Sequence, residues 1–162
     1  MRLAAILAAT LVLSPAALAG LPNPGKLVPG RSLAGIRIGE TQRQVTAALG
    51  RSHGVCTGCA FPTWYFSVRA FDQHGLAVEF ARGHVSAVYT IWQPDGWTGP
   101  KGLTLGAPQA QVDATAGALF QVMCTGYDAW VHDRKTVRTV YYILNGGLWG
   151  FGLMRANANP CR

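Results

Sequence analysis

The sequence is poor in charged residues, and its few charges are scattered. Only 13% of its 162 residues are charged, seven of these are acidic, and no basic run is longer than Arg134-Lys135. A protein that binds nucleic acid gathers its basic side chains on one face or along one helix. Glycoside hydrolysis needs a pair of carboxylates. The scarcity of acids and the scatter of bases therefore argue against both functions.

The sequence also lacks the short motifs of common enzymes. It has no G-x-S-x-G elbow, no H-E-x-x-H helix and no glycine loop of the kind that holds phosphate. The candidate bases are four histidines, of which His74 and His84 stand beside turn glycines, where a solvated histidine is ordinary, while His53 lies in a loop and His132 precedes a turn. We therefore expect a protein that is not an enzyme, with no catalytic residue, no metal and no cofactor.

A long apolar run occurs only at the N-terminus. Arg2 precedes the apolar residues 3–13, and Ala17-Leu18-Ala19 comes before Gly20, which is the pattern of a secretory signal peptide. The run is too short to cross a bilayer, which takes about 20 apolar residues. We expect cleavage after Ala19, which leaves 162 − 19 = 143 residues with a net charge of 13 − 7 = +6. The mature protein should be secreted or extracytoplasmic, without a membrane anchor.

Aromatic residues, glycine and proline are plentiful. Five Trp, six Phe and five Tyr supply ample surface to bury, which argues against disorder. Twenty Gly and nine Pro indicate many tight connections. This composition favours a β-rich protein over one built from long helices.

The cysteine count is even, at four. In an oxidising compartment such a set indicates disulfides. We predict the bridges Cys56–Cys59 and Cys124–Cys161, because each then stays within its own half of the chain. The C-x-x-C spacing of the first pair is also that of thiol–disulfide oxidoreductases, which place it at the N-terminus of a helix. Here it lies between a helix stop and a strand, so a structural bridge is favoured and redox activity is the alternative.

Two segments of the chain repeat each other. Residues 35–50 and 102–117 are identical at seven of sixteen positions without a gap. Each pattern predicts a short helix, at 41–49 and at 108–116, followed by a glycine stop. Thr41 and Gln44 have the spacing of a capping box at the start of the first helix.

An alternating apolar pattern follows each predicted helix and indicates half-buried strands. The strands are expected at 63–68, 76–80, 85–91, 128–132, 137–144 and 148–154. The predicted fold class is α+β, with two tandem repeats that each consist of a short helix followed by a three-stranded antiparallel meander. The expected divisions are a signal peptide at 1–19, an extended lead-in at 20–32, repeat 1 at 33–92, a joint at 93–101 and repeat 2 at 102–162. Whether the two sheets are continuous is left open.

The hairpin turns at 82–83 and 145–146 set the expected faces of the strands. A regular register after the first turn directs Ala87 and Tyr89 toward the helix. After the second turn, it places Tyr142, Trp149 and Phe151 together on the face away from the helix.

Repeat 2 is thus expected to be apolar on both faces. Its outer face either packs inside the chain, against repeat 1 or the joint, or forms a binding surface with Tyr142, Trp149 and Phe151 as anchors. Trp92 and Trp97 flank the joint, where they are expected to hold the two repeats together.

The repeated pattern carries a family resemblance. Gly35-Ile36-Arg37-Ile38-Gly39 leads through Val45 to Gly50 and then to a cysteine, and Gly102 leads through Val112 and Gly117 to Cys124. This layout resembles the tandem helix-plus-sheet repeat of the β-lactamase inhibitory protein family. Each repeat by itself resembles the small lipoproteins of the outer-membrane barrel-assembly machinery. The resemblance implies a sheet surface that grips another protein without catalysis.

From these observations we expect a secreted, non-enzymatic, monomeric protein-binding module of inhibitor-like or assembly-like type, with an unidentified protein as its partner. Two alternatives remain. One is a cell-envelope scaffold that binds anionic wall polymer through its scattered arginines, and salt dependence would distinguish it. The other is a thiol–disulfide active protein that works through Cys56 and Cys59.

Overall fold

The structure, a computed structural model, describes residues 25–67, 75–91, 94 and 96–162. The predicted signal peptide, His74 and Trp92 lie outside the described residues. Within the described part of the chain, no helix is long and apolar enough to cross a membrane.

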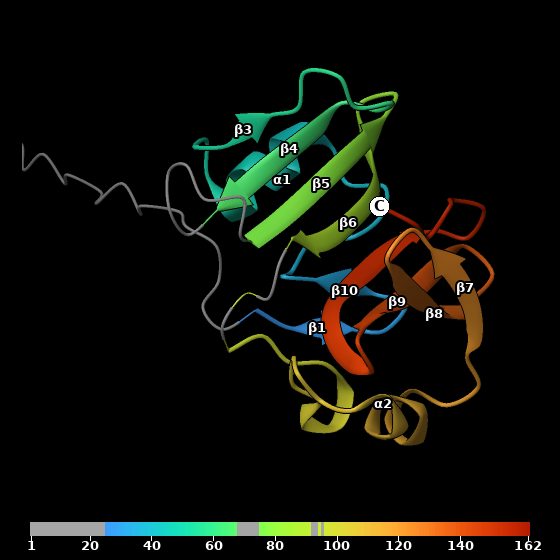
Figure 1. The fold of residues 1–162 in the computed structure, drawn as a ribbon. Helices are drawn as coiled ribbons and strands as arrows, with labels where there is room; N and C mark the ends of the chain where they lie inside the picture. The colour runs from blue at the N-terminus through green and yellow to red at the C-terminus, as the bar shows by residue number, and fades with distance from the viewer. Residues whose placement is uncertain (1–24, 68–74, 92–93, 95) are drawn as a thin grey trace, which may run out of the picture.

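Eight strands form one antiparallel sheet in the order β3-β4-β5-β6-β10-β9-β8-β7 (Figure 1). The strands are β3 Gly54–Val55, β4 Thr63–Ser67, β5 Gly75–Ala81, β6 His84–Ile91, β7 Phe120–Cys124, β8 Tyr127–Asp133, β9 Val137–Leu144 and β10 Gly147–Arg155. A separate two-stranded sheet pairs β1 Leu27–Val28 with β2 Ser32–Leu33. The helices are α1 Gln42–Leu49, α2 Gln109–Ala116 and the short 3₁₀ helix η1 Pro100–Gly102.

The predicted fold of two tandem repeats, each a helix with a three-stranded meander, is wrong. The chain is mostly β, and its strands form a single sheet because β6 pairs with β10 through Tyr89↔Gly152, Val88↔Leu153 and Ala87↔Met154. Two strands that were not expected, β3 and β7, occupy the two edges of this sheet.

Both short helices lie within one residue of their predicted starts. Thr41 caps α1, because the Gln44 N–H donates to Thr41 Oγ1 at 3.3 Å and the Thr41 N–H donates to Gln44 Oε1 at 2.8 Å. This is the predicted capping box. α1 buries Val45 and Leu49 against the sheet, and α2 buries Val112.

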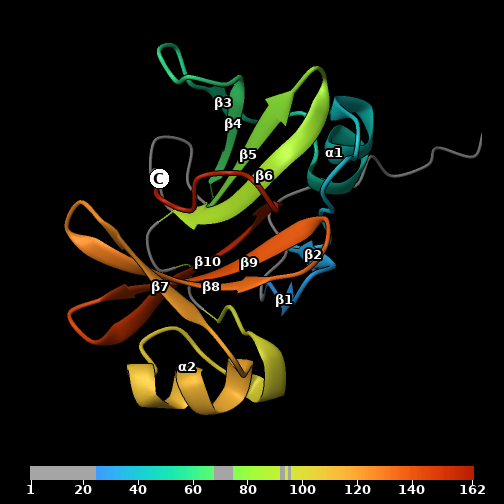
Figure 2. The same ribbon diagram turned by 90° about the vertical axis from the view of Figure 1, so that its right-hand side faces the viewer.

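One hydrophobic core runs along the helix side of the sheet, which we call the core face. Figure 2 shows the β1–β2 pair between α1 and α2. Leu27 and Leu33 from this pair are fully buried in the same cluster as residues from both helices. A Cβ at Gly25 would lie 2.4 Å from the ring of Trp97, which is also buried. Residues 25–33 therefore contribute Leu27 and Leu33 to the core, and they connect the two halves into one unit.

Each of the two central hairpins contains a β-bulge after its turn. Between β5 and β6 the register shifts at Ser86, and between β9 and β10 it shifts at Trp149. An extra residue in one strand moves every later side chain to the opposite face.

These bulges correct the faces that a regular register predicts. Val88 lies in the core, while Ala87 and Tyr89 belong to the apolar cluster on the other side of the sheet. Phe151 is fully buried in the core and lies on the opposite side of the sheet from Tyr142. The predicted face shared by Tyr142, Trp149 and Phe151 does not exist, because the bulge at Trp149 separates Phe151 from the other two.

The close approach of β10 to Thr90 can be tested with Gly150→Ala. A Cβ at position 150 would lie 2.4 Å from Thr90 Oγ1, which accepts a hydrogen bond from the Phe151 N–H at 2.9 Å. We expect the variant to lower the free energy of unfolding by about 1–3 kcal/mol in urea titrations.

The matched control is Gly54→Ala in an edge strand. Its Cβ would lie no closer than 3.8 Å to any other atom, so we expect a change within about 0.5 kcal/mol. Equal stability of the two variants would contradict the packing described for Gly150.

Candidate functional site

The face of the sheet away from the helices carries a second apolar cluster, and we call it the strap face. Six of its residues are buried and six are partly buried. The buried members are Ala87, Ala129, Val131, Val140, Tyr142 and Met154, and the partly buried members are Tyr89, Val122, Cys124, Tyr127, Trp149 and Ala158. The sheet is therefore apolar on both sides where β6, β10, β9 and β8 meet.

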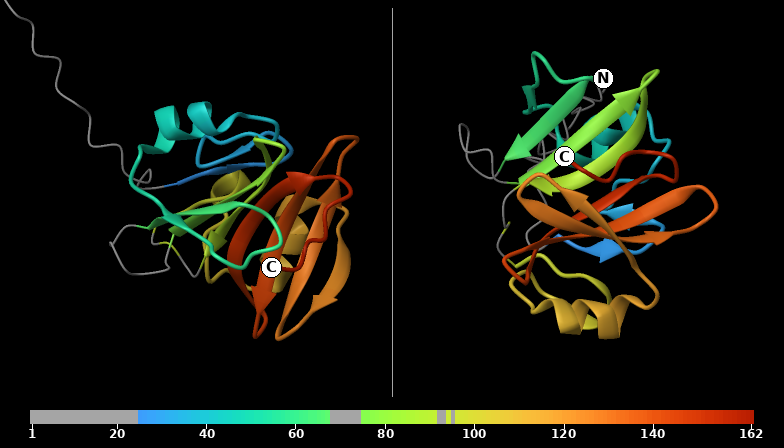
Figure 3. Two further views of the ribbon diagram at one scale, coloured as in Figure 1. Left: turned by 90° about the horizontal axis from the view of Figure 1, so that it is seen from above. Right: turned by 45° about the vertical axis from the view of Figure 1, so that its right-hand side comes forward.

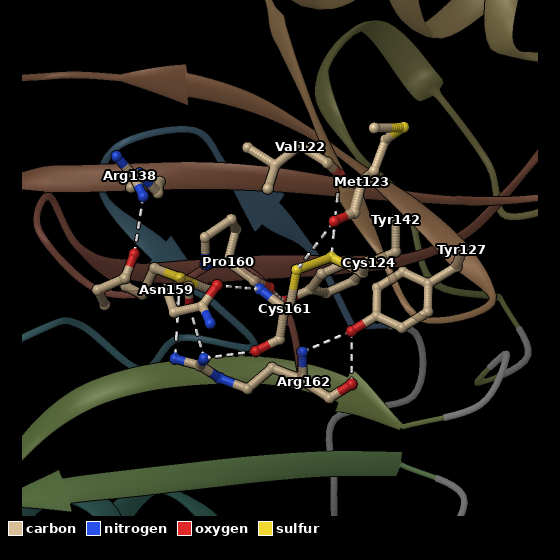
Figure 4. Close-up of a disulfide and its surroundings, with 12 residues drawn as sticks. Val122, Met123, Cys124, Tyr127, Arg138, Tyr142, Asn159, Pro160, Cys161 and Arg162 are labelled. Atoms are coloured by element: carbon tan, nitrogen blue, oxygen red, sulfur yellow. Dashed lines mark hydrogen bonds between the residues drawn. A yellow bond between two sulfur atoms is a disulfide. The ribbon is translucent and has the colours of Figure 1, made fainter.

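Residues 156–162, which we call the strap, cover part of this face (Figures 2 and 3). A disulfide joins Cys161 of the strap to Cys124 at the end of β7, with 5.5 Å between the Cα atoms. The Tyr142 hydroxyl donates to Pro160 O at 3.1 Å (Figure 4). The strap is thus tied to both the edge and the middle of the sheet.

Arg162 fixes the end of the strap to the sheet. Its Nε lies 2.9 Å from Glu79 Oε1 on β5, and its guanidinium carbon lies 5.5 Å from the centre of the Tyr89 ring. Its backbone N–H and carbonyl both form hydrogen bonds with the Tyr127 hydroxyl (Figure 4).

Glu79 is a carboxylic acid buried within the sheet, with 8% of its surface exposed. Burial raises its pKa above the ordinary value of 4.5, and the charge of Arg162 and a hydrogen bond with Tyr89 oppose this rise. The pKa of Tyr89 is raised far above its usual range, first by burial and then by the charge of Glu79. Arg162 therefore supplies the positive charge that this buried acid needs.

A pocket of about 120 Å³ opens beside the strap. It is lined by Tyr89, Thr90, Tyr127, Tyr142, Trp149 and Arg162. The Tyr127 ring lies 5.7 Å from the Tyr142 ring, nearly perpendicular to it, and 5.9 Å from the Trp149 ring. Aromatic rings from β6, β8, β9 and β10 thus converge on one small apolar space.

Two glycines on β10, Gly150 and Gly152, make room for these rings. A Cβ at Gly152 would lie 2.8 Å from the Tyr142 hydroxyl oxygen, and a Cβ at Gly150 would lie 3.4 Å from the Tyr142 ring. Tyr142 can therefore lie close over the backbone of β10. The bulge at Trp149 places that indole beside the same space.

The structure separates the three anchors predicted from the sequence. Tyr142 lines the pocket, but only 2% of its surface is exposed, and its pKa is raised above its usual range by burial. Trp149 lines the pocket and is half-buried, while Phe151 is in the core. Sequence reasoning missed Tyr127 and Arg162. The turn glycine before Tyr127 marks the start of a strand, but nothing local to Arg162 indicates its place.

Both predicted disulfides are present. The Cys56–Cys59 bridge lies in the loop between β3 and β4, with Cys59 Sγ 3.5 Å from the Tyr65 hydroxyl oxygen. No thiol is free among the described residues. The Cys56–Cys59 bridge follows strand β3 and does not lie at the start of a helix. Thiol–disulfide activity through this pair stays a prediction. Two disulfides are consistent with secretion.

The described histidines do not assemble a reactive site. His53 stacks on Trp64 with 4.0 Å between ring centres, and His84 contacts Arg82 O in the turn. His132 Nδ1 is buried and has no hydrogen-bond partner. In the described part of the chain, no group of three acidic, histidine or cysteine side chains could hold a metal ion. The expectation that the protein is not an enzyme stays a prediction.

Comparisons with known proteins find similar solved structures. No protein-family model matches the chain, and no curated protein matches its sequence. An extracellular protein with an SCP domain from Bacillus anthracis has a TM-score of 0.49 and 9% identity, covering 92% of this chain and 50% of that one. A cysteine-rich secretory protein from Staphylococcus aureus has a TM-score of 0.46 and 14% identity, covering 72% of this chain and 44% of that one. The chain spans half or less of the length of these proteins.

The fold corrects the resemblance drawn from the sequence, because one eight-stranded sheet stands in place of two repeats of a helix and a three-stranded meander. The similar structures are an extracellular protein with an SCP domain and a cysteine-rich secretory protein, and neither is named as a β-lactamase inhibitory protein or a barrel-assembly lipoprotein. The sixteen-residue pattern that suggested the family describes a glycine, a short helix and a second glycine. Such a local pattern fits many folds, so it did not determine the arrangement of the sheet.

Replacement of Glu79 by Gln should change how stability depends on pH. Because the folded state raises the pKa of Glu79 above 4.5, the native protein binds this proton more tightly than the unfolded chain does. The contribution of Glu79 to stability is therefore greatest below pH 4.5 and declines as the pH rises through the raised pKa. Gln cannot titrate, so the unfolding free energy of the wild type minus that of Glu79→Gln should fall across this window. Urea titrations at several pH values measure it, and a constant difference would contradict the raised pKa.

The two disulfides should contribute unequally to stability. The Cys124–Cys161 bridge closes a separation of 37 residues, and Cys56–Cys59 closes one of 3. On the chain-entropy estimate, these loops correspond to about 4 and about 2 kcal/mol. We expect Cys124→Ser with Cys161→Ser to lower the unfolding free energy more than Cys56→Ser with Cys59→Ser, measured by thermal unfolding. The reverse order would show that the strap is not bound as described.

Proposed function

We propose that the protein is an extracytoplasmic, non-enzymatic module that binds another protein through the strap face. The observation that supports this most directly is the aromatic pocket that Tyr127 and Trp149 form on the sheet. Tyr and Trp are common anchors of protein interfaces, because they offer large contact areas and lose little rotamer entropy. We place the centre of the interface at Trp149, which is half-buried.

The pocket is built on rigid elements. Five of its six lining residues belong to strands of the sheet, and the sixth, Arg162, is held by the ion pair with Glu79 and by the neighbouring disulfide. A preformed site loses less conformational entropy on binding than a mobile loop does. The arrangement therefore suits recognition of a partner without a large rearrangement.

Wall polymer is a weaker candidate, because arginines on this side of the sheet are already paired. Arg138 forms two hydrogen bonds with the carboxylate of Asp133, at 2.7 and 2.9 Å, and Arg162 pairs with Glu79. A polyanion site needs unpaired cations gathered in one place. The strap face offers aromatic rings instead.

The test is capture of a partner from the native envelope and medium by chemical cross-linking. We expect Trp149→Ala to lose the captured protein and Trp149→Phe to retain most of it, since an aromatic anchor persists. Phe61→Ala is the matched control, because Phe61 is an exposed aromatic residue in the Cys56–Cys59 region and should not affect capture. Near-ultraviolet circular dichroism establishes that each variant is folded.

Salt dependence separates the alternatives. Binding through aromatic anchors should change little with ionic strength, whereas binding of a charged polymer should weaken steeply as salt is added. Capture that survives in folded Trp149→Ala, or that disappears with moderate salt, would contradict the proposal. If Trp149→Ala does not fold, Tyr127→Leu tests the same wall of the pocket.

A further inference from the structure

We infer that the pocket on the strap face takes a single neutral aromatic side chain from the partner. This inference rests on the proposed function and specifies the chemistry of the contact. It follows from three properties of the pocket, which are its volume, the hydrogen bonds already made by its walls and the balance of charge around Arg162.

The volume admits one ring. At about 120 Å³, the pocket is well below the roughly 300–1,000 Å³ of sites that hold cofactors or drug-sized ligands. It is similar to an engineered apolar cavity of about 150 Å³ in another protein, which binds benzene. The volume therefore suits one ring on a short side chain.

Hydroxyl groups in the walls are engaged within the protein. The Tyr142 hydroxyl donates to Pro160 O, and the Tyr127 hydroxyl is bonded to the backbone of Arg162. Thr90 Oγ1 accepts from the Phe151 N–H at 2.9 Å. A polar ligand would lose its hydrogen bonds with water and would find these groups already bonded. The walls therefore favour an apolar group.

The balance of charge favours a neutral ligand. Arg162 forms part of the wall, but its charge is balanced by Glu79 at 2.9 Å and its Nη1 donates to Asn159 O and Cys161 O. An acidic or a basic side chain would therefore lose its hydration without gaining an unpaired partner. A neutral ligand avoids this cost.

An aromatic ring fits better than an aliphatic chain of similar size. The rings of Tyr127, Tyr142 and Trp149 already pack on one another, with 5.7 and 5.9 Å between ring centres. A ligand ring would extend this cluster through further aromatic pairs. The face of a guanidinium also attracts an aromatic ring. We expect a phenyl group to bind several-fold more tightly than an isobutyl group.

The experiment titrates the full chain with three blocked amino acids, N-acetyl-phenylalanine amide, N-acetyl-leucine amide and N-acetyl-lysine amide. The indole N–H resonance of Trp149, assigned by its loss in Trp149→Phe, reports binding by nuclear magnetic resonance. We expect a saturable shift with the phenylalanine compound at a Kd on the order of millimolar, weaker binding of the leucine compound and no saturation with the lysine compound. No saturable shift with phenylalanine, or equal binding of lysine, would overturn the inference.

Two variants show whether the shift arises from the pocket. Tyr127→Leu removes an aromatic wall and should weaken phenylalanine binding several-fold, which a second resonance, such as the Tyr142 ring, can follow. Trp130→Phe is the control, since Trp130 packs against the core cluster on the other face and should leave binding unchanged. Equal weakening by both variants would mean that the probe binds elsewhere.

Failure of this inference is distinguishable from failure of the proposed function. If the phenylalanine probe saturates the pocket but no protein is captured, the proposed function fails and the ring specificity is supported. If a protein is captured and lost in Trp149→Ala while no probe binds, the function is supported and the single-ring inference fails.

Discussion

The pairing of β6 with β10 is the constraint on which the rest of the structure depends. These strands are about 60 residues apart in sequence, and they join strands from the two halves of the chain into one sheet. The hydroxyl of Thr90 on β6 accepts from the Phe151 N–H on β10, in a close contact that Gly150 permits. Because of this junction, the core on one side and the aromatic pocket on the other are both shared between the halves.

The two bulges decide what each side of this junction contains. Without the extra residue at Trp149, Phe151 would share a face with Tyr142, as a regular strand predicts, and the core would lose a large buried ring. With the bulge, glycines at 150 and 152 face Tyr142. The same irregularity thus completes the core and leaves room for the pocket.

Local signals in the sequence predicted local structure. The capping box at Thr41, the glycine stops and the hairpin turns depend on a few neighbouring residues, and they lie where expected. The disulfides followed from proximity within each half. The β6–β10 pairing depends on distant segments of the chain. A bulge shifts the phase of the apolar alternation, but because the sheet is apolar on both sides, the hydropathy pattern does not reveal that shift. The face assignments and the fold of two helix-plus-meander repeats were therefore wrong, and the continuity of the sheet could not be predicted. Of the three predicted anchors, only Trp149 lies partly exposed at the pocket.

The burial of Glu79 explains why Arg162 of the strap is held on the sheet. A carboxylate buried on β5 is costly unless a positive charge and hydrogen bonds accompany it. No basic residue of β4, β5 or β6 pairs with it among the described contacts, and Arg162 supplies the charge from a distant part of the sequence. The disulfide at Cys161 holds the neighbouring residue and so limits how far Arg162 can move. Glu79 and the Cys124–Cys161 disulfide therefore act together to hold Arg162, and so they keep this wall of the aromatic pocket in place.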